Sequence, residues 1–205
     1  MKTLSLVATL AVTLLAARAE AIDFTPRFTD TIDDGVPIRR MTFSDGTQRI
    51  FYRPHPTWVQ SGSDQAVTFT PKDSDLAIVR IENAPAEHAR IPFDGPGSEA
   101  LRNIARALVP PDATEVTEVW EVPNPVVLQG WTSFEIGFDY VQFGQHFCRS
   151  ILFINLDPNR QIHFIVSAVP AEFQPLYKTA YRTLATWWQP TTVTTRLVPR
   201  FVPET

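Results

Sequence analysis

The stretch "GWTSFEIGFDYVQFGQHFCRSILFINLDPNRQIHFIVSAV", residues 130–169, decides the fold. Three runs within it are strongly apolar with interspersed polar residues, as in β-strands: residues 130–140, 146–155 and 160–169. The pairs Phe143-Gly144 and Pro158-Asn159 separate these runs and suit two-residue hairpin loops. The stretch therefore predicts three neighbouring antiparallel strands at the centre of a sheet.

The two loops fix a register, and the register decides which side chains share a face of the sheet. In this register Phe138 lies opposite Arg149, and Phe153 lies opposite both Phe134 and Phe164. One face then collects ten apolar side chains, and we expect it to be the core. They are Phe134, Ile136, Phe138, Phe147, Ile151, Phe153, Ile162, Phe164, Val166 and Ala168. Arg149 is the exception on this face, and we place it at the rim.

The other face of the three strands is mixed in polarity. Its members are Ser133, Glu135, Gly137, Asp139, Val141, His146, Cys148, Ser150, Leu152, Ile154, His163, Ile165 and Ser167. Five polar side chains on this face are the candidates for binding a ligand: Glu135, Asp139, His146, Ser150 and His163. We predict neither a metal site nor a cofactor.

The single cysteine, Cys148, raises the question of catalysis. In the predicted register Asp139 lies opposite Cys148, and His146 lies about 7 Å away along the same face. These residue types occur in thiol nucleophile sites and in metal sites, but zinc needs three or four ligands. His163 is roughly 20 Å from Cys148 along the strands. A mid-strand thiol opposite an acid has a raised pKa, so we interpret Cys148 as a packing residue.

The N-terminus has the pattern of a signal peptide. A lone Lys2 precedes an apolar run, and small residues allow cleavage after Ala19 or Ala21. The run is shorter than the roughly 20 residues that span a bilayer, so we expect residues 1–21 to be removed, leaving no transmembrane segment in the mature chain. The sequence therefore predicts an exported protein, periplasmic or secreted.

Composition excludes nucleic acid as a partner. Without residues 1–21 the chain keeps 16 of its 18 basic and 21 of its 22 acidic residues, a formal charge of −5. Its basic residues are scattered, whereas binding to a polyanion requires clustered Lys and Arg. With one cysteine no disulfide can form within the chain, so the fold depends on its hydrophobic core.

The remainder of the chain predicts short strands and two helices. We expect hairpin strands at 36–43 and 47–52, a second pair at 65–70 and 76–82, an irregular lead-in at 22–35 and a connector at 53–58. Ser98 is the predicted N-cap of a helix over 99–108. A second helix, 175–188, ends in Trp187 and Trp188, which cannot both face inward. Residues 190–205 read as an extended or disordered tail.

Residues 36–189 are therefore predicted to form a single α+β domain, an antiparallel β-sheet with helices packed on it. This order of elements resembles the PsbP-like superfamily. The resemblance covers roughly residues 36–188 and rests on the connector Pro54 to Trp58, "YVQFGQHFCRSILFI" (140–154) and "YRTLATW" (181–187). That superfamily includes lumenal accessory proteins of photosystem II and exported bacterial proteins of unknown role. It implies a PsbP-like sandwich and a binding or accessory role, and it transfers no functional residue.

Three functional hypotheses follow. The first is a non-catalytic exported accessory protein that binds a partner protein or a small ligand, through the mixed face or through the C-terminal helix and tail. The second is a thiol-dependent or hydrolytic enzyme that uses His146, Cys148 and Asp139. The third is an envelope-associated structural protein held to a surface by residues 190–205. The sequence favours the first, since no motif in it defines a catalytic site.

Overall fold

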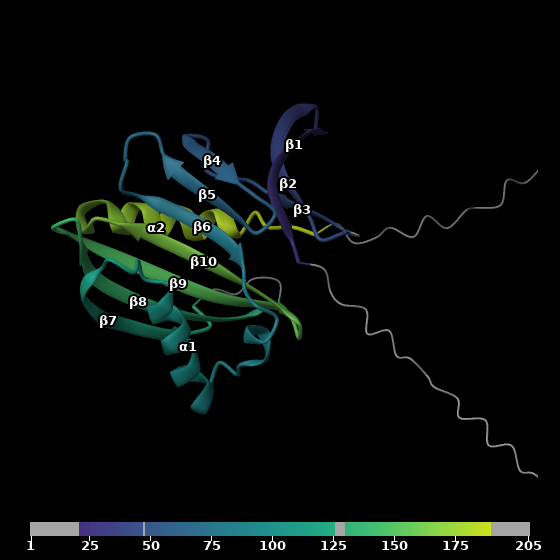
Figure 1. The fold of residues 1–205 in the computed structure, drawn as a ribbon. Helices are drawn as coiled ribbons and strands as arrows, with labels where there is room; N and C mark the ends of the chain where they lie inside the picture. Colours follow the sequence, from purple (N-terminus) through teal and green to yellow (C-terminus); the bar gives the residue numbers. More distant parts are fainter. Residues whose placement is uncertain (1–20, 47, 126–129, 190–205) are drawn as a thin grey trace, which may run out of the picture.

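The computed structural model describes residues 21–46, 48–125 and 130–189, which form two antiparallel sheets and two α-helices (Figure 1). The three-stranded sheet has the order β1-β2-β3, with β1 (Asp23–Asp33), β2 (Val36–Ser44) and β3 (Arg49–Tyr52). The seven-stranded sheet has the order β4-β5-β6-β10-β9-β8-β7, with β4 (Trp58–Gly62), β5 (Ala66–Pro71), β6 (Ile78–Asn83), β7 (Thr114–Pro123), β8 (Thr132–Gln142), β9 (Gln145–Asp157) and β10 (Arg160–Ala168). The helices are α1 (Pro96–Ala107) and α2 (Pro170–Leu184), with a 3₁₀ turn at His88–Arg90. The predicted α+β class is confirmed.

The first predicted hairpin of the central sheet is confirmed residue by residue. Gln142 pairs with Gln145, which places Phe138 opposite Arg149 and Asp139 opposite Cys148. The two loop residues, Phe143 and Gly144, have φ angles of 52° and 74°. Positive φ at both positions is the geometry whose twist matches that of the strands it joins. This turn fixes the register of β8 on β9.

The predicted register between β9 and β10 is wrong by one residue. Arg160 pairs with Asp157, so the two-residue loop is as predicted, but Gln161 then pairs with Asn155. Leu156 is the extra residue, and it forms a β-bulge in β9. As a result His163 lies opposite Phe153. Its side chain is on the other face of the sheet from the mixed face on which it was predicted.

The bulge gives the seven-stranded sheet two apolar faces. The α1 face packs Leu101, Ala105 and Val109 against Phe134, Ile136, Phe138, Tyr140, Phe147, Ile151, Phe153 and Ile165. The α2 face packs Leu176, Ala180 and Leu184 against Leu152, Ile154, Ile162, Phe164, Val166 and Ala168. Every residue of β10 from Gln161 to Ala168 is buried, so the two registers bury the same strand equally well. Hydrophobic pattern alone therefore could not exclude the one-residue slip.

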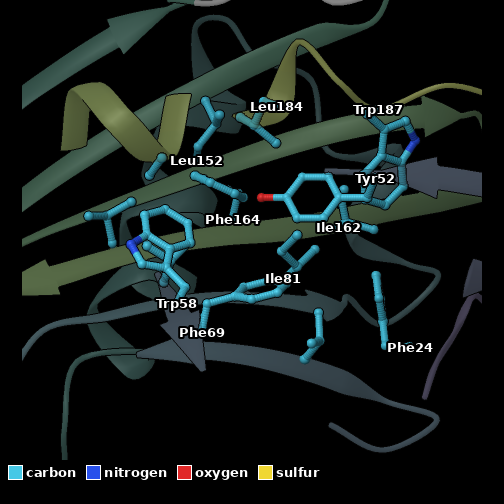
Figure 2. Packing of buried hydrophobic residues seen from close by; sticks show 14 of the residues in the cluster. Phe24, Tyr52, Trp58, Phe69, Ile81, Leu152, Ile162, Phe164, Leu184 and Trp187 are labelled. Atoms are coloured by element: carbon cyan, nitrogen blue, oxygen red, sulfur yellow. The ribbon is translucent and has the colours of Figure 1, made fainter. Parts of the chain in front are cut away.

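The three-stranded sheet closes the α2 face. Tyr52 reaches from β3 into the cluster, with Trp187 beside its ring and Phe69 nearby (Figure 2). Its hydroxyl and the Thr183 hydroxyl of α2 lie 2.5 Å apart, within hydrogen-bonding distance. The small sheet is thereby joined to the helix and to the large sheet in one core.

One segment predicted to be irregular is a strand, whereas the predicted connector is irregular up to Thr57. The expected lead-in 22–35 contains β1, which pairs with β2 from Asp23 to Asp33. The expected connector ends at Trp58, where β4 begins. Exposed apolar side chains such as Ile32 interrupt the alternation of buried and exposed residues in β1. The strand forms because its backbone groups pair with those of β2. Pairing of this kind leaves little trace in hydrophobicity.

Helix starts also differ from prediction. α1 begins at Pro96 with Gly95 as its N-cap, so Ser98 is not the cap. α2 begins at Pro170 and contains Pro175, and it ends before both tryptophans. Proline is common in the first turn of a helix, so the sequence favours Pro175 as the start, but in the structure Pro170 occupies that position and Pro175 lies inside the helix. Trp187 is buried and Trp188 is 47% exposed, which confirms that the two do not both face inward.

Arg149 is also misplaced by the prediction. It is buried instead of lying at the rim, and its Nε has no hydrogen-bond partner among the described residues. Burial lowers the pKa of Arg149 from its ordinary value, although the contact with Tyr140 opposes this. The long aliphatic part of arginine allows such burial beside apolar neighbours.

The close approach of Trp120 to Gly137 generates a stability prediction. A Cβ atom on Gly137 would lie 2.0 Å from the Trp120 ring, which also contacts Phe173 of α2. We expect Gly137→Ala to lower the free energy of unfolding by about 1–3 kcal/mol through overpacking, measured by urea denaturation. The control is the same substitution in a Trp120→Leu background, where the loss should shrink to less than half. Equal losses in both backgrounds would show that the ring is not the cause.

Candidate functional site

Glu135 and Ser150 are brought together, but beneath α2. The Ser150 hydroxyl donates to Glu135 Oε1 at 2.6 Å, and the Tyr177 hydroxyl donates to Oε2 at 3.1 Å. Glu135 is 1% exposed and Ser150 is fully buried. This part of the predicted mixed face is therefore an internal hydrogen-bond network between sheet and helix, and a ligand could reach it only if α2 moved.

Asp139, His146 and Cys148 lie near the β8–β9 turn. Asp139 and His146 are exposed, and Cys148 is partly buried. Burial raises the pKa of the Cys148 thiol to about 11, and a hydrogen bond with Asp139 and the charge of that residue add to the effect. Among the described residues no three His, Cys, Asp or Glu side chains are placed to hold a metal ion. The burial of Cys148 and its contact with Asp139 therefore disfavour the thiolate form that a nucleophile requires.

His163 lies on the α1 face, away from the other four candidates. It is 2% exposed, and its Nδ1 lies 3.3 Å from Glu82 Oε1 on the neighbouring strand β6. Arg80 Nε in turn lies 2.6 Å from Glu82 Oε2. Burial acts to raise the pKa of Glu82, but the hydrogen bonds from His163 and Arg80 and the charge of Arg80 outweigh it, so the pKa lies below its ordinary value. Glu82 is thus a carboxylate at neutral pH.

The second ring nitrogen of His163, Nε2, is buried and has no hydrogen-bond partner among the described residues. A carboxylate only accepts hydrogen bonds, so in the neutral form of the ring Nδ1 carries the proton and Nε2 presents a lone pair. The His88 ring stacks on His163 at 5.9 Å between centroids, and its Nδ1 is likewise buried without a partner. Burial, and after it the electrostatic effect of His163, lowers the pKa of His88, which is therefore neutral at pH 7.

A cleft of about 480 Å³ opens over these two imidazoles. The sheet, the 3₁₀ turn and the segment before it supply Glu82, Asn83, Pro85, His88 and His163, and the side of α1 supplies Asn103, Ile104, Ala107 and Leu108. The cleft therefore has an apolar wall on the helix and a polar floor on the sheet. This combination of an apolar cavity with a few convergent polar groups is typical of small-molecule sites.

Sequence reasoning selected His163 but missed its partners. Glu82 and His163 are 81 residues apart, and only the pairing of β6 with β10 brings them together. His88 follows the second predicted pair of strands in a segment without periodicity. The one available signal was that His163 interrupts an otherwise apolar strand, "QIHFIV".

Comparison with known proteins yields solved structures of similar fold at low sequence identity. No family model matches the chain, and no curated protein matches it. Similar solved structures include the Ran-binding protein Mog1p of Saccharomyces cerevisiae, which is 10% identical, with 80% of this chain and 96% of Mog1p covered and a TM-score of 0.49. LpqN of Mycobacterium tuberculosis, described as involved in cell envelope biogenesis, is 12% identical, with coverage of 81% and 92% and a TM-score of 0.46.

The cyanobacterial PsbP of Synechocystis is also among the similar structures. It is 10% identical, with 73% of this chain and 91% of that protein covered and a TM-score of 0.46. The class defined by the fold itself is an α+β protein of antiparallel sheets with a helix on each face of the larger one. No helix in the described ranges is long and apolar enough to cross a membrane.

The raised pKa of Cys148 predicts slow, strongly pH-dependent alkylation. Between pH 7 and 9.5 the folded chain should react with iodoacetamide roughly 100-fold more slowly than the urea-unfolded chain, whose thiol has a pKa of about 8.5. Because the fold favours the protonated thiol, its contribution to stability is present below about pH 8.5 and is lost as the pH rises toward 11. Reaction of the folded protein at pH 7 as fast as the unfolded chain would instead support a thiol-dependent enzyme.

Proposed function

We propose that this chain is an exported, non-catalytic binding protein whose small ligand occupies the cleft over His163. The single observation that carries the proposal is that His163 lines the cleft while its buried Nε2 has no partner among the described residues. Burying a polar group without a partner costs about 1–3 kcal/mol. A ligand that satisfies this nitrogen recovers that cost, so the unbound site is organised toward binding.

The position of His163 supports this proposal over an internal structural role. Its ring is fixed by Glu82 on one side and by an edge-to-face contact with Phe153, at 5.1 Å between centroids, on another. A ring fixed in this way presents Nε2 in one direction with little entropy left to lose on binding. The volume of the cleft also lies within the roughly 300–1,000 Å³ of ordinary ligand sites.

The composition of the cleft favours binding over catalysis. Glu82 and His163 reproduce the orienting acid and the base of a hydrolytic triad. Among the described residues that line the cleft, however, there is no serine, threonine, cysteine or lysine to act as a nucleophile. The thiol of Cys148 is on the opposite face of the sheet, toward α2, and is held in its protonated form.

Native mass spectrometry of the protein from its own host's exported fraction tests the proposal. We expect a chain that begins at Glu20 or Ile22, as the signal peptide predicts, with the added mass of a small molecule that denaturing conditions remove. His163→Phe should reduce the fraction that carries this mass. A chain that retains residues 1–19 would contradict export, and a ligand carried equally by the variant would contradict the cleft as its site.

A second candidate function, docking of a partner protein, is favoured by the surface around Trp188. Trp188 stacks on Phe51 at 5.2 Å between ring centroids, and the Arg40 guanidinium lies over the Phe51 ring at 6.0 Å from its centroid. Beside this pair is a hollow of about 450 Å³ that Arg53 also lines. Exposed tryptophan with arginine is the composition of interface hot spots, and no acidic residue of the described chain lines the hollow. An acidic partner segment therefore suits it.

Substitution of Trp188 tests this second candidate. If a partner chain co-purifies with the native protein, Trp188→Ala should reduce its recovery about tenfold or more, as removal of a hot-spot residue does. Val59→Ala, at a residue that is 54% exposed on β4, is the matched control and should leave recovery unchanged. Equal recovery with Trp188→Ala would eliminate this surface as the docking site.

A further inference from the structure

We infer that the ligand of the His163 cleft is an uncharged, largely apolar molecule with one hydroxyl or N–H group, which donates a hydrogen bond to His163 Nε2. This inference rests on the proposed binding function and specifies its chemistry. It follows from the proton positions in the chain Arg80–Glu82–His163 and from the residues that surround them.

The direction of the hydrogen bond is set by Arg80. Arg80 donates to Glu82 Oε2, and Glu82 Oε1 accepts from His163 Nδ1. Arginine cannot act as an acceptor, and the carboxylate cannot donate, so in the neutral form of His163 the ring proton lies on Nδ1. His163 Nε2 is left as the acceptor, and the group that meets it must be a donor.

With a neutral His163, the charges at the floor of the cleft disfavour an anionic head group. A carboxylate or phosphate would bring negative charge to the lone pair of Nε2 and close to Glu82. The positive charge of Arg80 is already engaged by Glu82 at 2.6 Å. The neutral His88 adds no cation to the floor. An anion would therefore lose its hydration without gaining a partner of opposite charge.

The wall of the cleft determines the rest of the ligand. Ile104 and Leu108 of α1, with Pro85, present apolar surface beside the stacked imidazoles. Asn83 is already engaged, because its amide donates to the Ile22 carbonyl at 2.7 Å and accepts from the Ile22 N–H at 3.2 Å. A ligand body that meets these surfaces gains by burying carbon, and a flat ring suits a site bordered by two imidazoles.

A matched pair of probes tests this inference on the purified mature chain. The probes are p-cresol, which has a hydroxyl donor, and 4-methylanisole, which has the same ring with the donor methylated. Each is titrated while the amide resonances of Leu108 and His88 are followed by NMR. We expect p-cresol to bind about 5- to 20-fold more tightly, the value of one hydrogen bond to an otherwise unsatisfied group.

Three variants make the test specific. His163→Phe should abolish the preference for p-cresol. Glu82→Gln should abolish or reverse the preference for p-cresol. Arg80 would hold the amide oxygen of the glutamine, so its N–H₂ group would face Nδ1 of His163. Nδ1 would then have to accept, and the proton of His163 would move to Nε2. Ala107→Trp, at an exposed helix residue that lines the cleft, should block both probes while leaving the fold intact.

The outcomes separate this inference from the proposed function. Equal binding of the two probes at the cleft, or tighter binding of 4-methylanisole, would overturn the hydroxyl inference while the cleft remained a binding site. Failure of both probes to shift the cleft resonances at millimolar concentration would overturn the proposed function together with the inference. Preference for p-cresol that persists in Glu82→Gln would show that His163 is not the acceptor.

Discussion

One extra residue in β9 controls which chemistry the sheet presents on each side. The bulge at Leu156 shifts β10 by one position, so His163 faces α1 while Phe164 faces α2. Without that residue His163 would lie on the α2 face, opposite Ile154. The bulge therefore places His163 and the hydrogen bonds of Glu135 on opposite faces of the sheet.

The two polar systems differ in how completely they are satisfied. Glu135 accepts from Ser150 and Tyr177 and is covered by α2, as expected of a buried group that contributes to a defined core. His163 is equally buried but has one nitrogen satisfied by Glu82 and one without a partner, at the floor of a cleft. The second group, which is left open, is the one at which we propose a ligand.

Sequence reasoning succeeded where a local turn fixed the geometry. The loop Phe143-Gly144 and the alternation around it predicted the register of β8 on β9, including Asp139 opposite Cys148. It failed at β10, where every side chain is buried and either register is apolar on both faces. It also missed the partnership of Glu82 with His163, because that contact depends on strand pairing across 81 residues. Long-range pairing and bulges are the features that local pattern does not encode.

The most direct test of this account is an NMR measurement on His163 itself. Long-range ¹H–¹⁵N correlation reports which ring nitrogen carries the proton, and nuclear Overhauser effects report which side chains surround the ring. We predict a proton on Nδ1, a lone pair on Nε2 in the neutral ring, and Overhauser effects to His88 and Phe153. A proton on Nε2, or Overhauser effects to Tyr177 and Tyr181 of α2, would contradict the placement of His163 on which the proposed site depends.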